Sequence, residues 1–184
     1  MGDDVEEARS KNQNQSQSQS QSQSQSQAAL QIIAQFTNLP RLVVFDLDYT
    51  LWPLYCEFYD EDYKPKLYEE AYGILYALKE KGIQMAVASR TPSPQVANAF
   101  LQNLGLDPMF VAKEIYPSWT HKTQHFESIH TKTGAPFTSM LFFDDEDRNI
   151  QAVSKMGVTC ILVEDGVNLG ALRQGLAEFS QKSS

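Results

Sequence analysis

The sequence lacks the long apolar runs and the basic patches that would direct a chain to a membrane or to nucleic acid. None of its apolar stretches reaches the roughly 18 residues of a membrane span. No basic segment followed by an apolar one suggests a secretory signal, and acids at positions 3, 4, 6 and 7 argue against a transit peptide. The formal net charge of -8 repels phosphate backbones. We therefore expect a cytoplasmic protein with no membrane and no nucleic-acid partner.

Cysteines and glycine-rich phosphate loops are also scarce. Cys56 and Cys160 lie far apart in the chain, which favours reduced thiols. A cysteine-dependent phosphatase needs an arginine six positions after its cysteine, but Asp62 and Gly166 occupy these positions. The chain has no Walker A lysine loop and no G-x-G-x-x-G motif. Chemistry that depends on a cysteine nucleophile or on such loops is therefore excluded.

The first 27 residues contain no aromatic side chain and almost no aliphatic one. Acidic residues come first, and a strict Gln-Ser alternation follows from Gln15. Neither face of this segment is apolar, so burial cannot offset an ordering entropy of roughly 1–2 kcal/mol per residue. We expect a disordered tail over 1–27, with a binding or phosphorylation segment as the alternative. A short helix or linker over 28–38 and a single domain over 39–184 would follow.

From Leu39 onward, short β-branched runs alternate with segments of helical periodicity. Strands are expected over 41–48, 83–88, 109–115, 140–143 and 158–163, and helices over 67–81, 94–104, 120–131, 146–156 and a last stretch that includes Phe179. This alternation implies right-handed crossovers and an α/β three-layer sandwich with a five-stranded, mainly parallel, Rossmann-like sheet. Loops at the carboxyl ends of such strands build the functional sites.

Polar residues follow three of these strands. Asp46 and Asp48 lie at the end of the first strand, Ser89 follows the second, and an acidic doublet at 144–145 follows the fourth. Each residue alone could form a turn or cap a helix, but the topology gathers them at one edge of the sheet. Clustered carboxylates repel one another unless a cation is present, and such oxygen ligands suit Mg²⁺. Ser89 and Lys122 are donors of the kind that hold phosphate oxygens.

These motifs resemble those of the haloacid dehalogenase (HAD) superfamily. LVVFDLDYT, over Leu42–Thr50, is similar to its first motif, and Ser89, Lys122 and Asp144 stand in the order of its second, third and fourth motifs. The runs FDLDYTLWP, VASRT and FFDDEDRNI are similar to the capless eukaryotic magnesium-dependent phosphatases, and the resemblance covers roughly Leu39 to Phe179. The intervals in which other members insert caps are too short here for one. The resemblance thus implies a HAD-like domain with no cap domain.

The resemblance also implies a magnesium-dependent phosphomonoester hydrolase with an aspartyl-phosphate intermediate. Asp46 would be the nucleophile and Asp48 the general acid and base. Mg²⁺ would contact the Asp46 carboxylate, the backbone carbonyl of Asp48, and Asp144. Groups that would contact the phosphate or the substrate belong to Leu47 (backbone N–H), Ser89, Arg90, Lys122 and Tyr55. Asp145 and Thr50 would orient these groups without contacting the substrate themselves.

As substrates, the resemblance implies protein phosphotyrosine or sugar phosphates such as fructosamine phosphates, and we expect the protein to act as a monomer. An aromatic segment over Tyr49–Tyr63 either rims the site or packs on the core. Two alternatives to an enzyme are a receiver-like phospho-accepting domain, whose motif order differs, and a catalytically inactive interaction module, against which the intact acids argue. A zinc site at His121 and His125 lacks a fourth ligand, so surface or capping histidines are expected instead.

Overall fold

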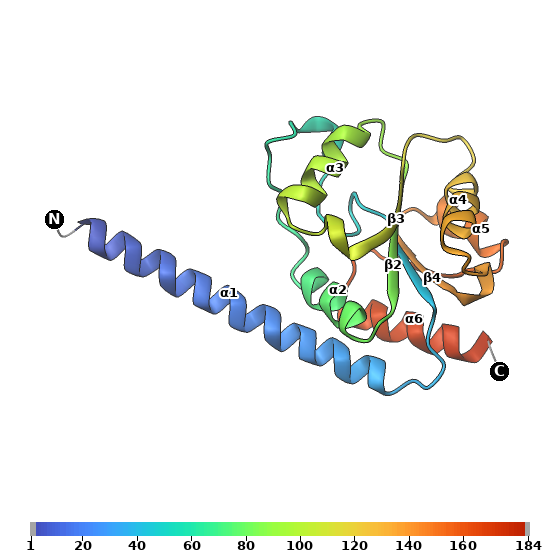
Figure 1. Cartoon of the computed structure of the whole chain (residues 1–184), viewed down its shortest axis with the longest axis horizontal. Coiled ribbons are helices and arrows are strands. Elements are labelled where there is room, and N and C mark those ends of the chain that lie inside the picture. Colours follow the sequence, from blue (N-terminus) through green and yellow to red (C-terminus); the bar gives the residue numbers. More distant parts are fainter. Residues whose placement is uncertain (1–2, 183–184) are drawn as a thin grey trace.

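A computed structural model describes residues 3–182, and its centre is a five-stranded sheet (Figure 1). Every neighbouring pair of strands is parallel, in the order β3-β2-β1-β4-β5, which confirms the predicted α/β architecture. The first strand is therefore central, with the second and fourth strands beside it. The strands are β1 (Leu42–Phe45), β2 (Gln84–Ser89), β3 (Phe110–Ile115), β4 (Met140–Asp144) and β5 (Thr159–Leu162).

Helices cover both faces of this sheet and complete the three layers. Figure 1 shows α4 and α5 on one side of the sheet, with α2, α3 and α6 on the other side. The α-helices are α1 (Asp3–Ala34), α2 (Ala71–Glu80), α3 (Pro94–Asn103), α4 (Thr123–Thr133), α5 (Asp147–Ser154) and α6 (Leu169–Lys182), and the 3-10 helices are η1 (Cys56–Phe58), η2 (Asp107–Met109) and η3 (Phe137–Ser139). Within residues 3–182, neither the interval from Asp48 to Ser89 nor that from Ser89 to Lys122 carries a separate cap domain.

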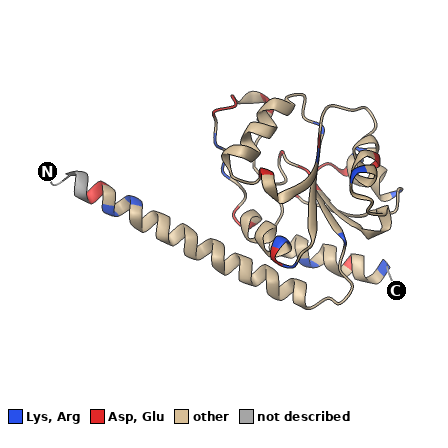
Figure 2. Cartoon of the chain, viewed as in Figure 1, with Lys and Arg blue, Asp and Glu red and all other residues tan. Residues whose placement is uncertain are grey.

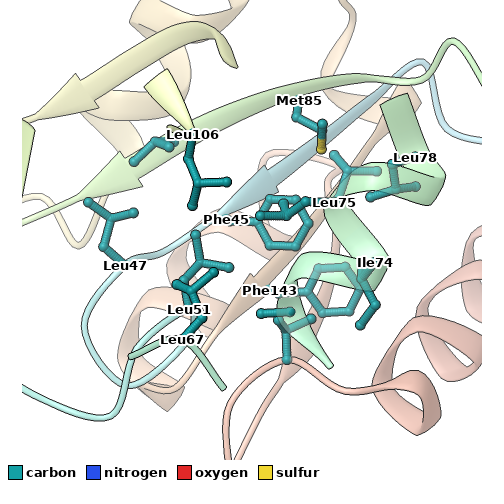
Figure 3. Close-up of a cluster of buried hydrophobic side chains, with 14 of the residues drawn as sticks. Phe45, Leu47, Leu51, Leu67, Ile74, Leu75, Leu78, Met85, Leu106 and Phe143 are labelled. Atoms are coloured by element: carbon teal, nitrogen blue, oxygen red, sulfur yellow. The ribbon is translucent and has the colours of Figure 1, made fainter. Parts of the chain in front are cut away.

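The core explains why the strand sequences read as continuous apolar runs. Successive side chains of a strand point to opposite faces, and in β1 both faces are buried. Val43 and Phe45 join the larger core cluster, while Leu42 and Val44 join the smaller cluster under α4 and α5. Phe45 also stacks on Phe143 of β4, with ring centroids 5.6 Å apart (Figure 3). Burial on both faces fixes the depth and direction of β1, and therefore of the residues that follow it.

The N-terminal tail corrects the expectation of disorder. Residues 3–27 and the predicted short helix form one continuous helix, α1, whose last turns are anchored by the buried side chains of Ala29, Ile32 and Ile33. Once one end is fixed, each further residue adds one backbone hydrogen bond without a new nucleation cost. Glutamine is also among the better helix formers, and serine hydroxyls such as that of Ser16 bond to carbonyls three residues earlier. The tail's own lack of apolar surface gives no sign of this anchor, which lies beyond residue 27.

Helix α1 approaches α2 closely at Gly73. A Cβ atom at this position would lie 2.8 Å from both the Cβ atom of Gln25 and the backbone nitrogen of Ser26. Gln21 adds a hydrogen bond of 2.6 Å from its Nε2 to Oε1 of Glu69. In Figure 2 charged residues occupy only the N-terminal end of α1, so α1 itself contributes no charged side chain to this contact. None of the helices within residues 3–182 is both long and apolar enough to cross a membrane.

Candidate active site

Three carboxylates meet at the carboxyl ends of β1 and β4. The two strands pair in parallel with Phe45 opposite Phe143, and the N–H of Asp46 donates to the carbonyl of Phe143 at 3.0 Å. The next residue of each strand, Asp46 and Asp144, therefore emerges at the same edge. Carboxylate oxygens of Asp46, Asp144 and Asp145 all lie within 4.8 Å of one another. We call these three residues the acidic trio.

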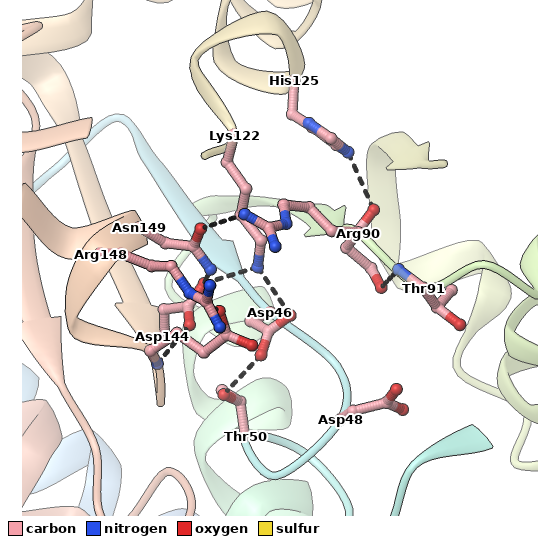
Figure 4. Close-up of polar contacts among 12 residues, drawn as sticks. Asp46, Asp48, Thr50, Arg90, Thr91, Lys122, His125, Asp144, Arg148 and Asn149 are labelled. Carbon is pink, nitrogen blue, oxygen red and sulfur yellow. Dashed lines mark hydrogen bonds and ion pairs between the residues drawn. The ribbon is translucent and has the colours of Figure 1, made fainter. Parts of the chain in front are cut away.

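A buried ammonium group binds two members of the acidic trio. Lys122 is 1% exposed, and its Nζ lies 2.7 Å from Oδ1 of Asp46 and 2.5 Å from Oδ2 of Asp144 (Figure 4). The backbone just before α4 directs this side chain inward through two successive left-handed residues, His121 with φ of 50° and Lys122 with φ of 72°. Non-glycine residues rarely adopt this conformation, and the strain is found mainly at functional sites.

The acidic trio carries more negative charge than the single ammonium group of Lys122 can offset. Burial raises the pKa of Asp46 to about 7, although the Lys122 ammonium opposes the rise. Burial and the nearby Asp46 charge raise the pKa of Asp144 to about 6, again opposed by Lys122. For Lys122, burial favours the neutral form, but the two carboxylates outweigh it and raise its pKa. Three acids against one ammonium, with converging oxygens, fit a hard divalent cation such as Mg²⁺.

Asn149 holds the acidic trio from the side of α5. Its Nδ2 donates to Oδ2 of Asp144 at 3.2 Å, and the N–H of Glu146 donates to the other oxygen of Asp144 at 2.8 Å. Oδ1 of Asn149 accepts a hydrogen bond of 3.2 Å from Arg90. Asn149 is not among the site residues predicted from the sequence. The available signal was a polar residue within the FFDDEDRNI run, on the helix that directly follows the acidic doublet.

Asp48 lies apart from the acidic trio and is held by different donors. Its side chain points away from Asp46 (Figure 4) and accepts from Nε1 of Trp52 at 2.8 Å and from the N–H of Cys56 at 3.2 Å. Burial raises the pKa of Asp48, and these two donors oppose the rise. The two carboxylates that follow β1 therefore occupy different environments, as a division between nucleophile and acid-base group requires.

A small cleft of about 130 Å³ opens over these groups. Seven of the residues selected from the sequence line it, together with five others: Asp46, Asp48, Tyr55, Ser89, Arg90, Lys122 and Asp145, and then Glu57, Thr91, Pro92, Glu146 and Asn149. Asp144 and Thr50 lie beneath the cleft, where the Thr50 hydroxyl donates to Oδ2 of Asp46 at 3.1 Å. The side chain of Leu47 is buried in the core, so only its backbone remains for the predicted phosphate contact.

The histidines differ in part from the expectation of surface or capping roles. His125 is fully buried, and its Nε2 lies 2.9 Å from the carbonyl oxygens of both Ser89 and Tyr116. This ring ties the end of β2 to the segment after β3 and thereby positions Ser89. His121 accepts a hydrogen bond of 2.9 Å from Arg90 through its Nδ1. The metal-type cluster found among residues 3–182 contains carboxylates and no histidine.

The aromatic segment after β1 divides between core and cleft. Trp52 is fully buried and packs edge-on against Phe100 of α3, with ring centroids 5.4 Å apart. Tyr55 is 46% exposed and Phe58 76% exposed, and the Tyr55 ring lies 4.7 Å from that of Tyr49. Both interpretations of the segment thus hold, each for different residues. Tyr55 lies beside the phosphate-sized cleft, and Trp52 belongs to the core.

A buried lysine among converging carboxylates, beside a cleft that holds little more than a phosphate group, suits the transfer of a phosphoryl group. The acids lie at the ends of the first and fourth strands of a parallel α/β sheet. Together, these features place the protein in a class of phosphoryl-transfer enzymes.

Comparison with known proteins identifies the family within this class. The model of the Acid Phosphatase family matches residues 38–65 and 58–182. Magnesium-dependent phosphatase 1 of Homo sapiens is 44% identical over 159 residues, which cover 78% of this chain and 89% of the human protein. The chain belongs to the Acid Phosphatase family and is a HAD-superfamily phosphatase.

Solved structures show the same fold. A HAD-superfamily hydrolase from Ehrlichia chaffeensis has a TM-score of 0.60 at 14% identity and covers 78% of this chain and 98% of its own. D,D-heptose 1.7-bisphosphate phosphatase from B. bronchiseptica, solved with magnesium and phosphate, has a TM-score of 0.56 at 16% identity and covers 74% and 86%. Together with the family match and the acidic trio, these comparisons confirm the predicted magnesium-dependent phosphatase.

Proposed function

We propose that this protein hydrolyses phosphate monoesters through a phosphorylated Asp46. The observation that carries the proposal is the acidic trio bridged by Lys122, because it places an anionic nucleophile, a cation and a cation-binding cluster on one cleft. Mg²⁺ would be held by Asp46 and Asp144, with Asp145 close enough to join them, and by the backbone carbonyl of Asp48. Bound there, it supplies positive charge that offsets the charge of the phosphate.

The residues of this chain would then carry out two displacements. A carboxylate oxygen of Asp46 attacks phosphorus, the bond to the ester oxygen breaks, and Asp48 donates its proton to the departing alcohol. Asp48, now ionised, takes a proton from a water molecule that attacks the same phosphorus, and this step releases inorganic phosphate and regenerates Asp46. Ser89, Lys122 and Arg90 would hold the phosphate oxygens throughout, since all three line the cleft.

We further propose protein phosphotyrosine or sugar phosphates such as fructosamine phosphates as substrates for a monomeric enzyme. The cleft has no cap above it within residues 3–182. The exposed ring of Tyr55 lines it, the exposed ring of Phe58 packs against Tyr55, and both offer apolar surface to the organic part of a substrate. Both features favour substrates larger than the cleft itself. Such a phosphorylated small molecule or phosphoprotein would be the partner of the site.

The test is turnover of a panel of phosphorylated metabolites and phosphotyrosine peptides at fixed Mg²⁺, repeated with EDTA. We expect continuous release of phosphate that stops when the metal is removed. Incorporation of a single phosphate without turnover would instead indicate a receiver-like domain. No reaction with any member of the panel or with a generic aryl phosphate would indicate an inactive interaction module.

A further inference from the structure

The loop after β1 folds back so that Trp52 reaches the side chain of Asp48. Tyr49 takes a left-handed conformation, with φ of 58°, and its N–H donates to the carbonyl of Trp52 at 2.7 Å. Asp48 and Trp52 also form an isolated β-bridge. Because Trp52 is fully buried against Phe100, its indole ring is fixed by the core and not by the cleft.

Two N–H groups then converge on one oxygen of Asp48. The indole Nε1 of Trp52 donates at 2.8 Å and the backbone N–H of Cys56 at 3.2 Å, both to Oδ1. A buried indole N–H needs an acceptor, and this carboxylate supplies it. Within residues 3–182 the other oxygen, Oδ2, accepts only a weak hydrogen bond from the thiol of Cys56, with Sγ at 3.7 Å. An oxygen that already accepts two N–H donors has no room for a proton of its own, whereas Oδ2 does.

We infer that Trp52 and the backbone N–H of Cys56 are positioning groups that aim Oδ2 of Asp48 at the leaving oxygen of the substrate. The inference rests on the proposed function, in which Asp48 is the proton donor and acceptor. The two N–H groups hold the carboxylate turned away from the acidic trio and leave Oδ2 to carry the proton. Without them, the side chain rotates freely, and proton transfer to the departing alcohol becomes inefficient.

The test is the dependence of kcat/KM on the leaving group, because only a poor leaving group needs the proton. For Trp52→Phe, which keeps the aromatic packing on Phe100, we expect kcat/KM for 2-phenylethyl phosphate to fall about tenfold or more, since a positioned acid contributes about 10²–10⁴-fold. The fall with 4-nitrophenyl phosphate, whose leaving group needs no proton, is expected to be much smaller. Trp119→Phe is the matched control, because Trp119 is 99% exposed and does not line the cleft.

A second pair of variants isolates the backbone donor, because both members make the same change to the buried thiol of Cys56. Cys56 is the first residue of η1, where proline is tolerated, and Tyr55 before it is extended, with φ of -90° and ψ of 114°, as the residue before a proline must be. Cys56→Pro and Cys56→Ala both lose the thiol, but only the proline variant loses the N–H. We expect kcat/KM to depend more steeply on the leaving group in the proline variant than in the alanine variant.

The outcomes separate this inference from the proposed function. If the parent protein releases no phosphate from any of these esters with Mg²⁺, the proposed function fails. If the parent is active and folded Trp52→Phe loses the same factor on both esters, the inference is overturned, because a merely structural role lowers both rates alike. Equal leaving-group dependence in the Cys56→Pro and Cys56→Ala proteins would overturn the claim that the backbone N–H of Cys56 positions Asp48. Circular dichroism and a melting curve establish folding for each variant.

Discussion

Removal of metal is expected to make the stability of this protein strongly dependent on pH. In the folded, metal-free state the pKa of Asp46 is about 7 and that of Asp144 about 6, against 3.8 for an ordinary aspartate. A carboxyl group with a raised pKa binds its proton more tightly in the folded chain than in the unfolded one. Stability therefore falls as pH rises from about 3.8 through these values, and the full penalty is present above pH 7. For Asp46 alone the difference corresponds to about 4 kcal/mol.

Mg²⁺ should reverse this loss where the carboxylates are ionised. At pH 8 a concentration of 100 times Kd stabilises by about 2.7 kcal/mol, which raises Tm by about 5–10 °C for a chain of this size. At pH 5 both carboxyl groups hold protons that the ion must displace, so the same concentration should raise Tm much less. The assay is thermal melting after EDTA treatment, with and without MgCl₂, at both pH values.

The controls make this reasoning refutable. Asp46→Asn removes one member of the acidic trio and should abolish most of the Mg²⁺-dependent rise at pH 8. Asp62→Asn removes an exposed carboxylate far from the trio in the sequence and should retain it. An equal rise of Tm at pH 5 and pH 8, or a full rise in the Asp46→Asn protein, would show that the ion binds elsewhere or that the trio is not destabilised by its charge.

Three further predictions concern the nucleophile and the N-terminal helix. Asp46→Asn should lower turnover more than about a hundredfold, a rise of ~2.7 kcal/mol in the barrier, with an unchanged circular dichroism spectrum; residual activity above that level would argue against this nucleophile. Deletion of residues 1–27 should leave kcat/KM unchanged, because none of the described residues 3–27 lines the cleft, and a large loss would show that α1 affects the site. Gly73→Ala should lower Tm, since its Cβ would meet the α1 backbone at 2.8 Å; in the protein without residues 1–27 the same change should raise Tm, because alanine favours helix by about 1 kcal/mol. A rise of Tm in the full chain would contradict the close packing of α1.

The order of strands and helices after Leu39 was readable from the sequence. Each strand that is buried on both faces needs a short, continuous apolar run, and each covering helix needs an apolar stripe. The helix predicted over 67–81 also ends where expected: Gly82 has φ of 72°, and the N–H of Ile83 donates to the carbonyl of Leu78. Boundaries shifted by a few residues, for example in α2, which begins at Ala71 instead of 67.

The site residues were predictable in part, for a reason that follows from the topology. Parallel strands place the residues after their carboxyl ends at one edge, so Asp46, Ser89 and the acidic doublet could be grouped without coordinates. Asn149 and the bond between Trp52 and Asp48 could not, because a polar residue on a helix and an apolar one in a loop carry no local sign of what they contact. The sequence predicts Trp52 only as a member of the aromatic segment over Tyr49–Tyr63, which either rims the site or packs on the core.

The sequence by itself determined the alternation of elements and the chemical types at the strand ends, because both depend on local periodicity and on the order of residues along the chain. The tertiary structure decided which of these groups contact one another. It brought Asp145 into the acidic trio, turned Asp48 toward Trp52, buried His125 between two carbonyls, and extended α1 from an apolar anchor at Ile32 and Ile33. Each of these outcomes depends on contacts between segments distant in sequence, and the free energy of such contacts has no signature in any one segment.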